Sequence, residues 1–68
     1  MREYLLSTDY IELLKLLKIT GLAQTGGQAG ILVTEGLVTV NGQKEFRKRA
    51  KLRKGDVVIT RGVTIQIV

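Results

Sequence analysis

The sequence predicts an α+β domain in which two short, packed helices are followed by a small, mostly antiparallel sheet. Residues 10–35 contain two stretches with apolar side chains at helical spacing, and a glycine follows each stretch. From residue 37 onward, short apolar stretches alternate with turn-forming pairs such as Asn41-Gly42, which is typical of hairpins. Helices that precede the strands, rather than alternating with them, indicate the α+β class.

The chain is short, with 68 residues and no evident linker or repeat, so residues 1–68 are expected to form one domain. A domain of this size buries only about 60% of the surface that its unfolded chain exposes, so its core is thin. The sequence contains neither Cys nor His, which removes disulfides and the usual ligands of a structural zinc. We therefore expect a fold that packing alone stabilises, without a cofactor or a metal.

The N-terminal third is predicted to contain a strand and a helix. Residues 2–6 are interpreted as a short leading strand, and Ser-Thr-Asp at residues 7–9 as a helix start signal for a helix over residues 10–18. Asp9 and Glu12 lie three residues apart, which favours a capping box over a pair of catalytic carboxylates.

The first helix is expected to be mostly buried. Ile11, Leu14 and Leu17 mark its apolar stripe, which Leu13 and Leu16 widen. The glycine at position 21 is expected to end the helix in a left-handed conformation.

A second helix is predicted over residues 26–35, with Thr25 as its N-cap and with Ala29, Leu32 and Val33 on its inward face. Each glycine inside a helix costs up to about 1 kcal/mol relative to Ala. This helix contains three of them: Gly26, Gly27 and Gly30. We expect that glycines occupy these positions because the backbone closely approaches another helix or a ligand.

The remaining strands are predicted to form two hairpins. The first covers residues 37–46 and turns at Asn41-Gly42, and Phe46 is expected to anchor its end in the core. The second covers residues 57–68 and turns at Arg61-Gly62. Apolar and polar side chains alternate in its last strand, which predicts that one face of that strand is buried.

Residues 42–56, here called the basic segment, carry the entire net charge of +5. Only Glu45 and Asp56 oppose its cations, and the other 53 residues contain equal numbers of basic and acidic side chains. The segment is interpreted as a loop with short extended ends, held by Phe46 and Leu52. It contains seven of the 11 basic residues: Lys44, Arg47, Lys48, Arg49, Lys51, Arg53 and Lys54.

This concentration of one charge favours anion binding. A surface that only keeps a protein soluble normally intersperses both signs of charge. Dense Lys and Arg side chains on a fixed loop suit phosphate groups, and Arg matches phosphate oxygens with two parallel donors.

Two further groups of residues are candidates for the same function. Lys15 and Lys18 are spaced to share one face of the first helix. The start of the second helix exposes free backbone amides at residues that could contact a phosphate: Thr25, Gly26, Gly27 and Gln28. It is not a P-loop, because no Lys-Ser or Lys-Thr pair follows the glycines.

Aromatic side chains are scarce, since the chain has only Tyr4, Tyr10 and Phe46. Platforms on which single-stranded bases stack are therefore expected to contribute little. The composition favours recognition of phosphates and of the shape of folded RNA.

Other function classes are weaker or remain open. Enzymatic activity is not expected, because the commonest general base and the strongest nucleophile are both missing. Membrane binding is not expected either, since the basic segment lacks an apolar face and no apolar run reaches about 18 residues. The N-terminus lacks the pattern of a signal peptide, which predicts a cytoplasmic protein. A protein-interaction module that docks an acidic partner remains the alternative to RNA binding.

Three stretches, in this order, resemble the S-four-type RNA-binding domain, or alpha-L motif, which takes its name from a small-subunit ribosomal protein. They are ITGLAQTGGQA at residues 19–29, EGLVTVNG at 35–42 and LRKGDVV at 52–58. Thr-Gly-Gly and Arg-Lys-Arg-Ala-Lys are most similar to the small stand-alone bacterial members, the YaaA-type proteins. The resemblance implies a module that binds structured RNA (ribosomal RNA, a ribosomal precursor or tRNA), with ribosomal particles as further partners. It implies no catalysis, because the enzymes of the family carry separate catalytic domains.

The resemblance also implies which residues form the RNA-binding surface. In many members a Ser-Arg-Ser-like sequence opens the second helix, whereas this chain has Gly26 and Gly27 there, and Gly30 where a basic residue is common. The expected contacts therefore shift to backbone amides and to the basic segment. The implied surface comprises Lys15, Lys18, Thr25, Gly26, Gly27, Gln28, Lys44, Arg47, Lys48, Arg49, Lys51, Arg53 and Lys54, with Asn41 and Gly42 shaping the hairpin.

Overall fold

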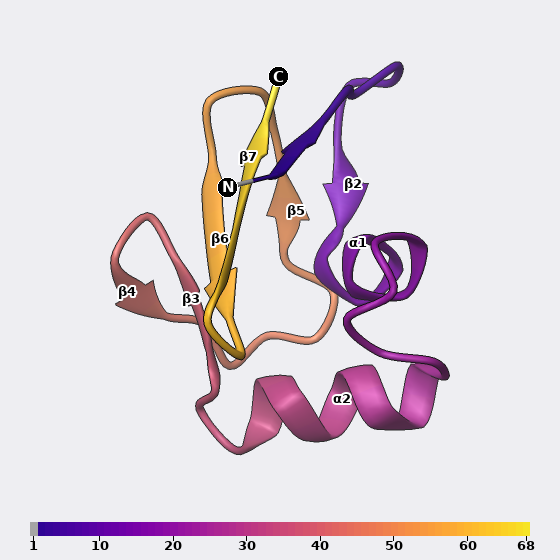
Figure 1. Cartoon of the computed structure of the whole chain (residues 1–68), viewed down its shortest axis with the longest axis vertical. Coiled ribbons are helices and arrows are strands. Elements are labelled where there is room, and N and C mark those ends of the chain that lie inside the picture. Colours follow the sequence, from indigo (N-terminus) through magenta and orange to yellow (C-terminus); the bar gives the residue numbers. More distant parts are fainter. Residues whose placement is uncertain (1) are drawn as a thin grey trace.

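The computed structural model describes residues 2–68 and has the predicted α+β architecture, with two helices packed beside a sheet (Figure 1). The elements, in chain order, are β1 (Arg2–Tyr4), β2 (Ile11–Glu12), α1 (Leu13–Ile19), α2 (Gly26–Thr34), β3 (Val38–Val40), β4 (Gln43–Lys44), β5 (Lys51–Leu52), β6 (Val57–Thr60) and β7 (Val63–Ile67).

The main sheet has five strands in the order β1-β7-β6-β3-β4, and the two short strands β2 and β5 pair separately. Only β1 and β7 are parallel, so the sheet is mostly antiparallel, as predicted. Both predicted hairpin turns are confirmed. Asn41 and Gly42 have φ of 53° and 85°, and Arg61 and Gly62 have φ of 53° and 76°. Positive φ at both central residues characterises a type I′ turn.

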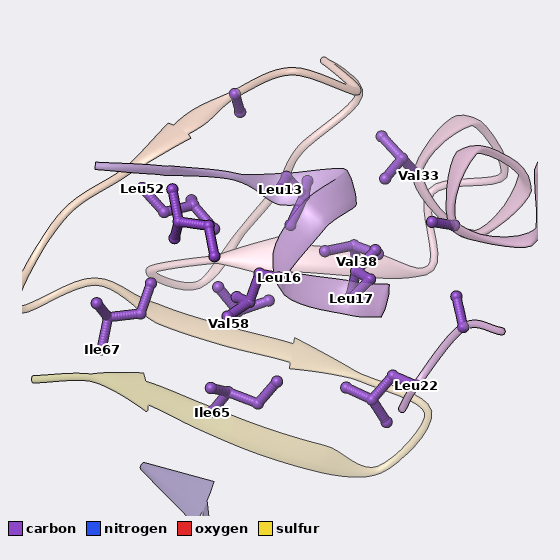
Figure 2. Packing of buried hydrophobic residues seen from close by; sticks show 14 of the residues in the cluster. Leu13, Leu16, Leu17, Leu22, Val33, Val38, Leu52, Val58, Ile65 and Ile67 are labelled. Carbon is purple, nitrogen blue, oxygen red and sulfur yellow. The ribbon is translucent and has the colours of Figure 1, made fainter. Parts of the chain in front are cut away.

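The core lies between the sheet and the two helices, and the leucines of α1 occupy its centre (Figure 2). The buried face of α1 is formed by Leu13, Leu16 and Leu17, whereas Leu14 is only half-buried. Ile11 is buried as well, so the predicted stripe is confirmed except at Leu14, although α1 begins three residues later than predicted. Sheet residues such as Val58 and Ile65 complete the core.

The predicted start of the first helix was wrong because a non-local strand pair replaces the local cap. Ile11 and Glu12 form β2, which pairs antiparallel with β5, so Ile11 lies opposite Leu52. No side chain caps α1, and the predicted capping box does not form. The helix ends as expected, with Gly21 at a φ of 79°.

The second helix is confirmed, including its N-cap. The Thr25 hydroxyl accepts a hydrogen bond from the Gln28 amide at 3.1 Å, and α2 ends at Thr34, one residue earlier than predicted. The expected approach of another helix does not account for its glycines: at Gly30 the nearest neighbour of an added Cβ is the side chain of Lys48, at an ordinary contact distance of 3.5 Å. Within residues 2–68, and leaving aside the adjacent chain and helix backbone, no atom lies within 4 Å of such a position at Gly26, and only the Thr25 hydroxyl does at Gly27.

Phe46 is not the anchor that the sequence indicated. Its side chain is 57% exposed and lies against Gly36, where an added Cβ would be 3.3 Å from the phenyl ring. The return strand β4 ends at Lys44, so the chain has already left the sheet at Phe46. Leu52 is buried and holds the basic segment as predicted, together with the buried Ala50 in place of Phe46.

The burial pattern makes a testable prediction about stability. Leu16 is fully buried, so we expect Leu16→Ala to lower the free energy of unfolding by about 2–5 kcal/mol, through lost apolar burial and the cavity left behind. Leu5→Ala is the matched control, because Leu5 is 76% exposed and should change stability by no more than about 0.5 kcal/mol. Urea unfolding followed by circular dichroism measures both, and equal losses would contradict the packing described above.

Candidate nucleic-acid interface

The backbone of the basic segment is fixed against the start of α1. The Ala50 carbonyl accepts a hydrogen bond from the Leu13 amide at 2.9 Å, and the Lys48 carbonyl accepts one from the Leu14 amide at 3.3 Å. These carbonyls satisfy amides that a helix leaves without partners in its first turn. Because β5 also pairs with β2, the cations of this segment extend from a held backbone rather than from a free loop.

Arg47 is held by a neighbouring carboxylate. Its Nε lies 3.0 Å from Glu45 Oε2, and its Nη2 donates to Glu45 Oε1 at 3.2 Å. The Glu45 side chain is 16% exposed, whereas that of Arg47 is 80% exposed. The hydrogen bonds and charge of Arg47 lower the pKa of Glu45, and Glu45 in turn raises the pKa of Arg47. The pair therefore orients an exposed guanidinium and offsets part of its charge.

Arg49 is held in a similar way, but by a residue far away in the sequence. Its Nε donates to Glu12 Oε2 at 2.9 Å. Arg49 also lines a surface hollow of about 600 Å³, and Lys15 of α1 lines the same hollow. The fold thus places one cation of the basic segment beside one of the two predicted cations of the first helix.

Lys48 connects the basic segment to α2. Its aliphatic chain lies over Gly30, with Cε 3.5 Å and Nζ 3.8 Å from the position of an added Cβ. A larger side chain at position 30 would compete for the space that Lys48 occupies. Gly30, which is buried, is therefore covered by a lysine from the basic segment.

Lys51 and Arg53 lie near the ring of a tyrosine. The ammonium group of Lys51 lies 4.9 Å from the centroid of the Tyr10 ring, and the guanidinium carbon of Arg53 lies 5.9 Å from it. Cations at these distances are attracted to the face of an aromatic ring. Tyr10 was expected to contribute little, and the structure places it at the edge of the cationic surface.

Asn41 connects the first hairpin turn to the end of the basic segment through side-chain hydrogen bonds. Its Nδ2 donates to Asp56 Oδ1 at 3.0 Å, and its Oδ1 accepts from the Val57 amide at 2.9 Å. Asp56 Oδ2 accepts from the Arg53 amide at 2.8 Å. These bonds join the turns at the two ends of the basic segment, which agrees with the prediction that Asn41 and Gly42 shape the hairpin.

The start of α2 is organised separately. Gln28 Oε1 accepts from the Gln24 amide at 2.9 Å, so this side chain helps to close the turn before the helix. Gln28 also lines a second hollow, of about 240 Å³, together with Arg61. Thr25, Gly26 and Gly27 are exposed beside it. Of the predicted residues of this helix start, none is among those that line the hollow of Lys15 and Arg49.

The other predicted cations, Lys18, Lys44 and Lys54, are exposed. Sequence reasoning missed the contributions of Glu12 and Tyr10. One signal was available for Glu12, since Ile-Glu at residues 11–12 and Lys-Leu at 51–52 are complementary in charge and hydrophobicity when paired antiparallel.

Within residues 2–68, no three His, Cys, Asp or Glu side chains gather in a way that could hold a metal ion. In the same part of the chain, neither helix has the length and apolar character needed to cross a bilayer.

Comparison with known proteins identifies related sequences and a related structure. A family model described as the S4 domain matches residues 4–68. The protein YbcJ of Escherichia coli (strain K12) is 42% identical over 59 residues, which cover 87% of this chain and 84% of YbcJ. The Shigella flexneri protein of the same name has the same identity and coverage.

The solution structure of E. coli YbcJ is similar to this fold, with a TM-score of 0.77 and 39% identity. The match covers 100% of this chain and 87% of the YbcJ chain. That structure is described as revealing an alpha-L motif involved in RNA binding.

The Glu45–Arg47 pair predicts a pH effect. Because Arg47 lowers the Glu45 pKa in the folded state, the pair stabilises the fold above the pKa that Glu45 has in the unfolded chain. This contribution is lost as the pH falls through the lower, folded-state pKa. NMR titration of the Glu45 carboxyl carbon should show its pKa rising in Arg47→Ala. An unchanged Glu45 pKa in that variant would contradict the interaction between Glu45 and Arg47.

Proposed function

Since this chain belongs to the S4 family of RNA-binding domains, we propose that it binds structured RNA without catalysing a reaction, and that its target is ribosomal RNA or a ribosomal precursor. In this proposal it acts in the cytoplasm, as a module that contacts ribosomal particles. The YbcJ structure, with its alpha-L motif involved in RNA binding, supports the choice of ligand. The ribosomal protein from which the domain takes its name supports the choice of RNA class.

The observation that carries the proposal is the docked basic segment. Its seven cations extend from a segment whose backbone caps α1 and whose Lys48 side chain contacts α2, so they are carried by a support that is fixed on the fold. Phosphate contacts supply much of the affinity in protein–nucleic acid complexes and set the register of the protein on its ligand. Cations on a fixed backbone therefore suit a folded RNA, whose phosphates also have fixed positions.

The paired arginines strengthen this argument. Glu45 and Glu12 each hold one arginine of the basic segment, while about 80% of each arginine side chain stays exposed. An oriented guanidinium loses less side-chain entropy when it binds a phosphate with two donors. The carboxylates also reduce the local positive charge, which disfavours indiscriminate binding of any polyanion.

We expect the salt dependence of RNA binding to report these phosphate contacts. If about five phosphates are neutralised, the logarithm of the affinity for a hairpin RNA should fall with the logarithm of salt concentration, with a slope of about −3.5 to −4.5. Lys48→Ala combined with Arg49→Ala should weaken binding and make the slope shallower by about 2. Fluorescence anisotropy at several salt concentrations measures both quantities.

The matched control combines Arg2→Ala with Arg61→Ala, which also removes two positive charges. These arginines donate to the Thr20 and Leu22 carbonyls and lie outside the basic segment. Their removal should change the slope much less. A nearly flat salt dependence of the unmodified protein, or equal effects of the two double variants, would refute binding through the basic segment.

Crosslinking in cells, followed by sequencing of the attached RNA, tests the proposed target. Ribosomal RNA or its precursors should be enriched over total RNA, and this enrichment should decrease in the variant that lacks the Lys48 and Arg49 side chains. Enrichment of tRNA or messenger RNA alone would overturn the ribosomal assignment. Recovery of an acidic protein without RNA would favour the alternative of a protein-interaction module.

A further inference from the structure

We propose that the hollow of about 600 Å³ beside α1 receives one unpaired nucleotide of the bound RNA. We call it the tyrosine hollow; its lining includes Tyr4, Tyr10, Lys15 and Arg49, together with Ser7 and Thr8. This proposal rests on the RNA binding proposed above and assigns a specific ligand to a site outside the start of α2.

The hollow has the size and the position that a nucleotide requires. Binding sites for small molecules typically have volumes of about 300–1,000 Å³. Residues that connect β1 to α1 form most of its wall, and Arg49 of the basic segment also lines it. An RNA strand that follows the basic segment therefore passes the rim of the hollow.

Two of the three aromatic residues of the chain lie in its wall, although they are six residues apart in the sequence. The Tyr10 side chain is held near Lys51 and Arg53 by contacts to its ring, and it remains 39% exposed. A tyrosine that is exposed but fixed is suited to stacking with a base. Although aromatic residues are scarce in the sequence, the fold brings two of them together in the wall of this hollow.

The charges of the hollow favour a phosphate at its rim. Lys15 is exposed, and Arg49 is held by Glu12 through Nε, with its side chain 81% exposed. Among residues 2–68, no hydrogen bond involves the Arg49 Nη groups. These groups and the Lys15 ammonium can therefore bind the phosphate of a nucleotide whose base enters the hollow.

The carboxylates of the hollow explain why the ligand should carry a base. Asp9 and Glu12 also line it, and a bare phosphate entering the hollow would meet their repulsion. Carboxylate oxygens instead accept hydrogen bonds from the N–H groups of a base or from a ribose hydroxyl. A ligand with a phosphate at one end and hydrogen-bond donors at the other is complementary to both groups.

The nucleotide must be unpaired, because a base within a helix is covered on both faces and presents only its edge. A bulge or a loop can turn one base outward, at a cost of a few kcal/mol for unstacking. Structured RNA that contains such a base would thus engage the basic segment and the tyrosine hollow together.

The test compares two hairpin RNAs that differ only in a single bulged nucleotide, which is the fluorescent adenine analogue 2-aminopurine. The unmodified protein should bind the bulged hairpin roughly tenfold more tightly than the fully paired one, within the range reported for stacking of one base. Binding should also quench the fluorescence of the bulged base. Tyr10→Ala should abolish both the preference and the quenching, whereas Tyr10→Phe should retain them.

Heteronuclear NMR spectra establish whether each variant is folded. A titration of the unmodified protein with a mononucleotide provides a test that requires no variant. On the unmodified protein, adenosine monophosphate should shift the amide resonances of the tyrosine hollow in a saturable way, whereas inorganic phosphate should shift them less. Equal affinity for the two hairpins with no quenching would overturn the nucleotide site while leaving RNA binding intact. Failure of the unmodified protein to bind either hairpin would instead refute the proposed function.

Discussion

The contact on which the rest of this structure depends is the docking of the basic segment on the start of α1. It combines two strand-like residue pairs, between β2 and β5, with two backbone hydrogen bonds to the first amides of the helix. Unpaired amides in a partly buried helix end would cost free energy, so this contact fixes where α1 begins. It also fixes where the cations of the segment lie.

The same contact means that folding of the domain already orders the basic segment. A loop of like charges would by itself repel and extend, and ordering it on binding would cost entropy. Here Ala50 and Leu52 are buried, and the two arginines between Phe46 and Ala50 each pair with a carboxylate. The folding of the domain thus supplies the ordering that an RNA ligand would otherwise have to induce.

The acidic residues position parts of this surface. Glu45 and Glu12 position arginines, and Asp56 joins the turns at the two ends of the segment through Asn41 and the Arg53 amide. Net charge alone would suggest a uniform cationic surface. The arrangement of the carboxylates instead divides it into oriented guanidiniums, exposed lysines and a hollow of mixed charge, in which the two tyrosines lie.

Local patterns in the sequence determined the α+β class, the second helix with its Thr25 cap, the type I′ turn at Asn41-Gly42 and the place of the second hairpin turn, because each depends on residues close together in the chain. They also located the cations, although which of them bind RNA stays a prediction. Only the tertiary structure decided the start of α1, the exposure of Phe46, the cover of Lys48 over Gly30 and the meeting of Tyr10 with Lys51. These features join residues far apart in the sequence, and local propensity carries no information about which distant backbone will supply a hydrogen bond or a surface.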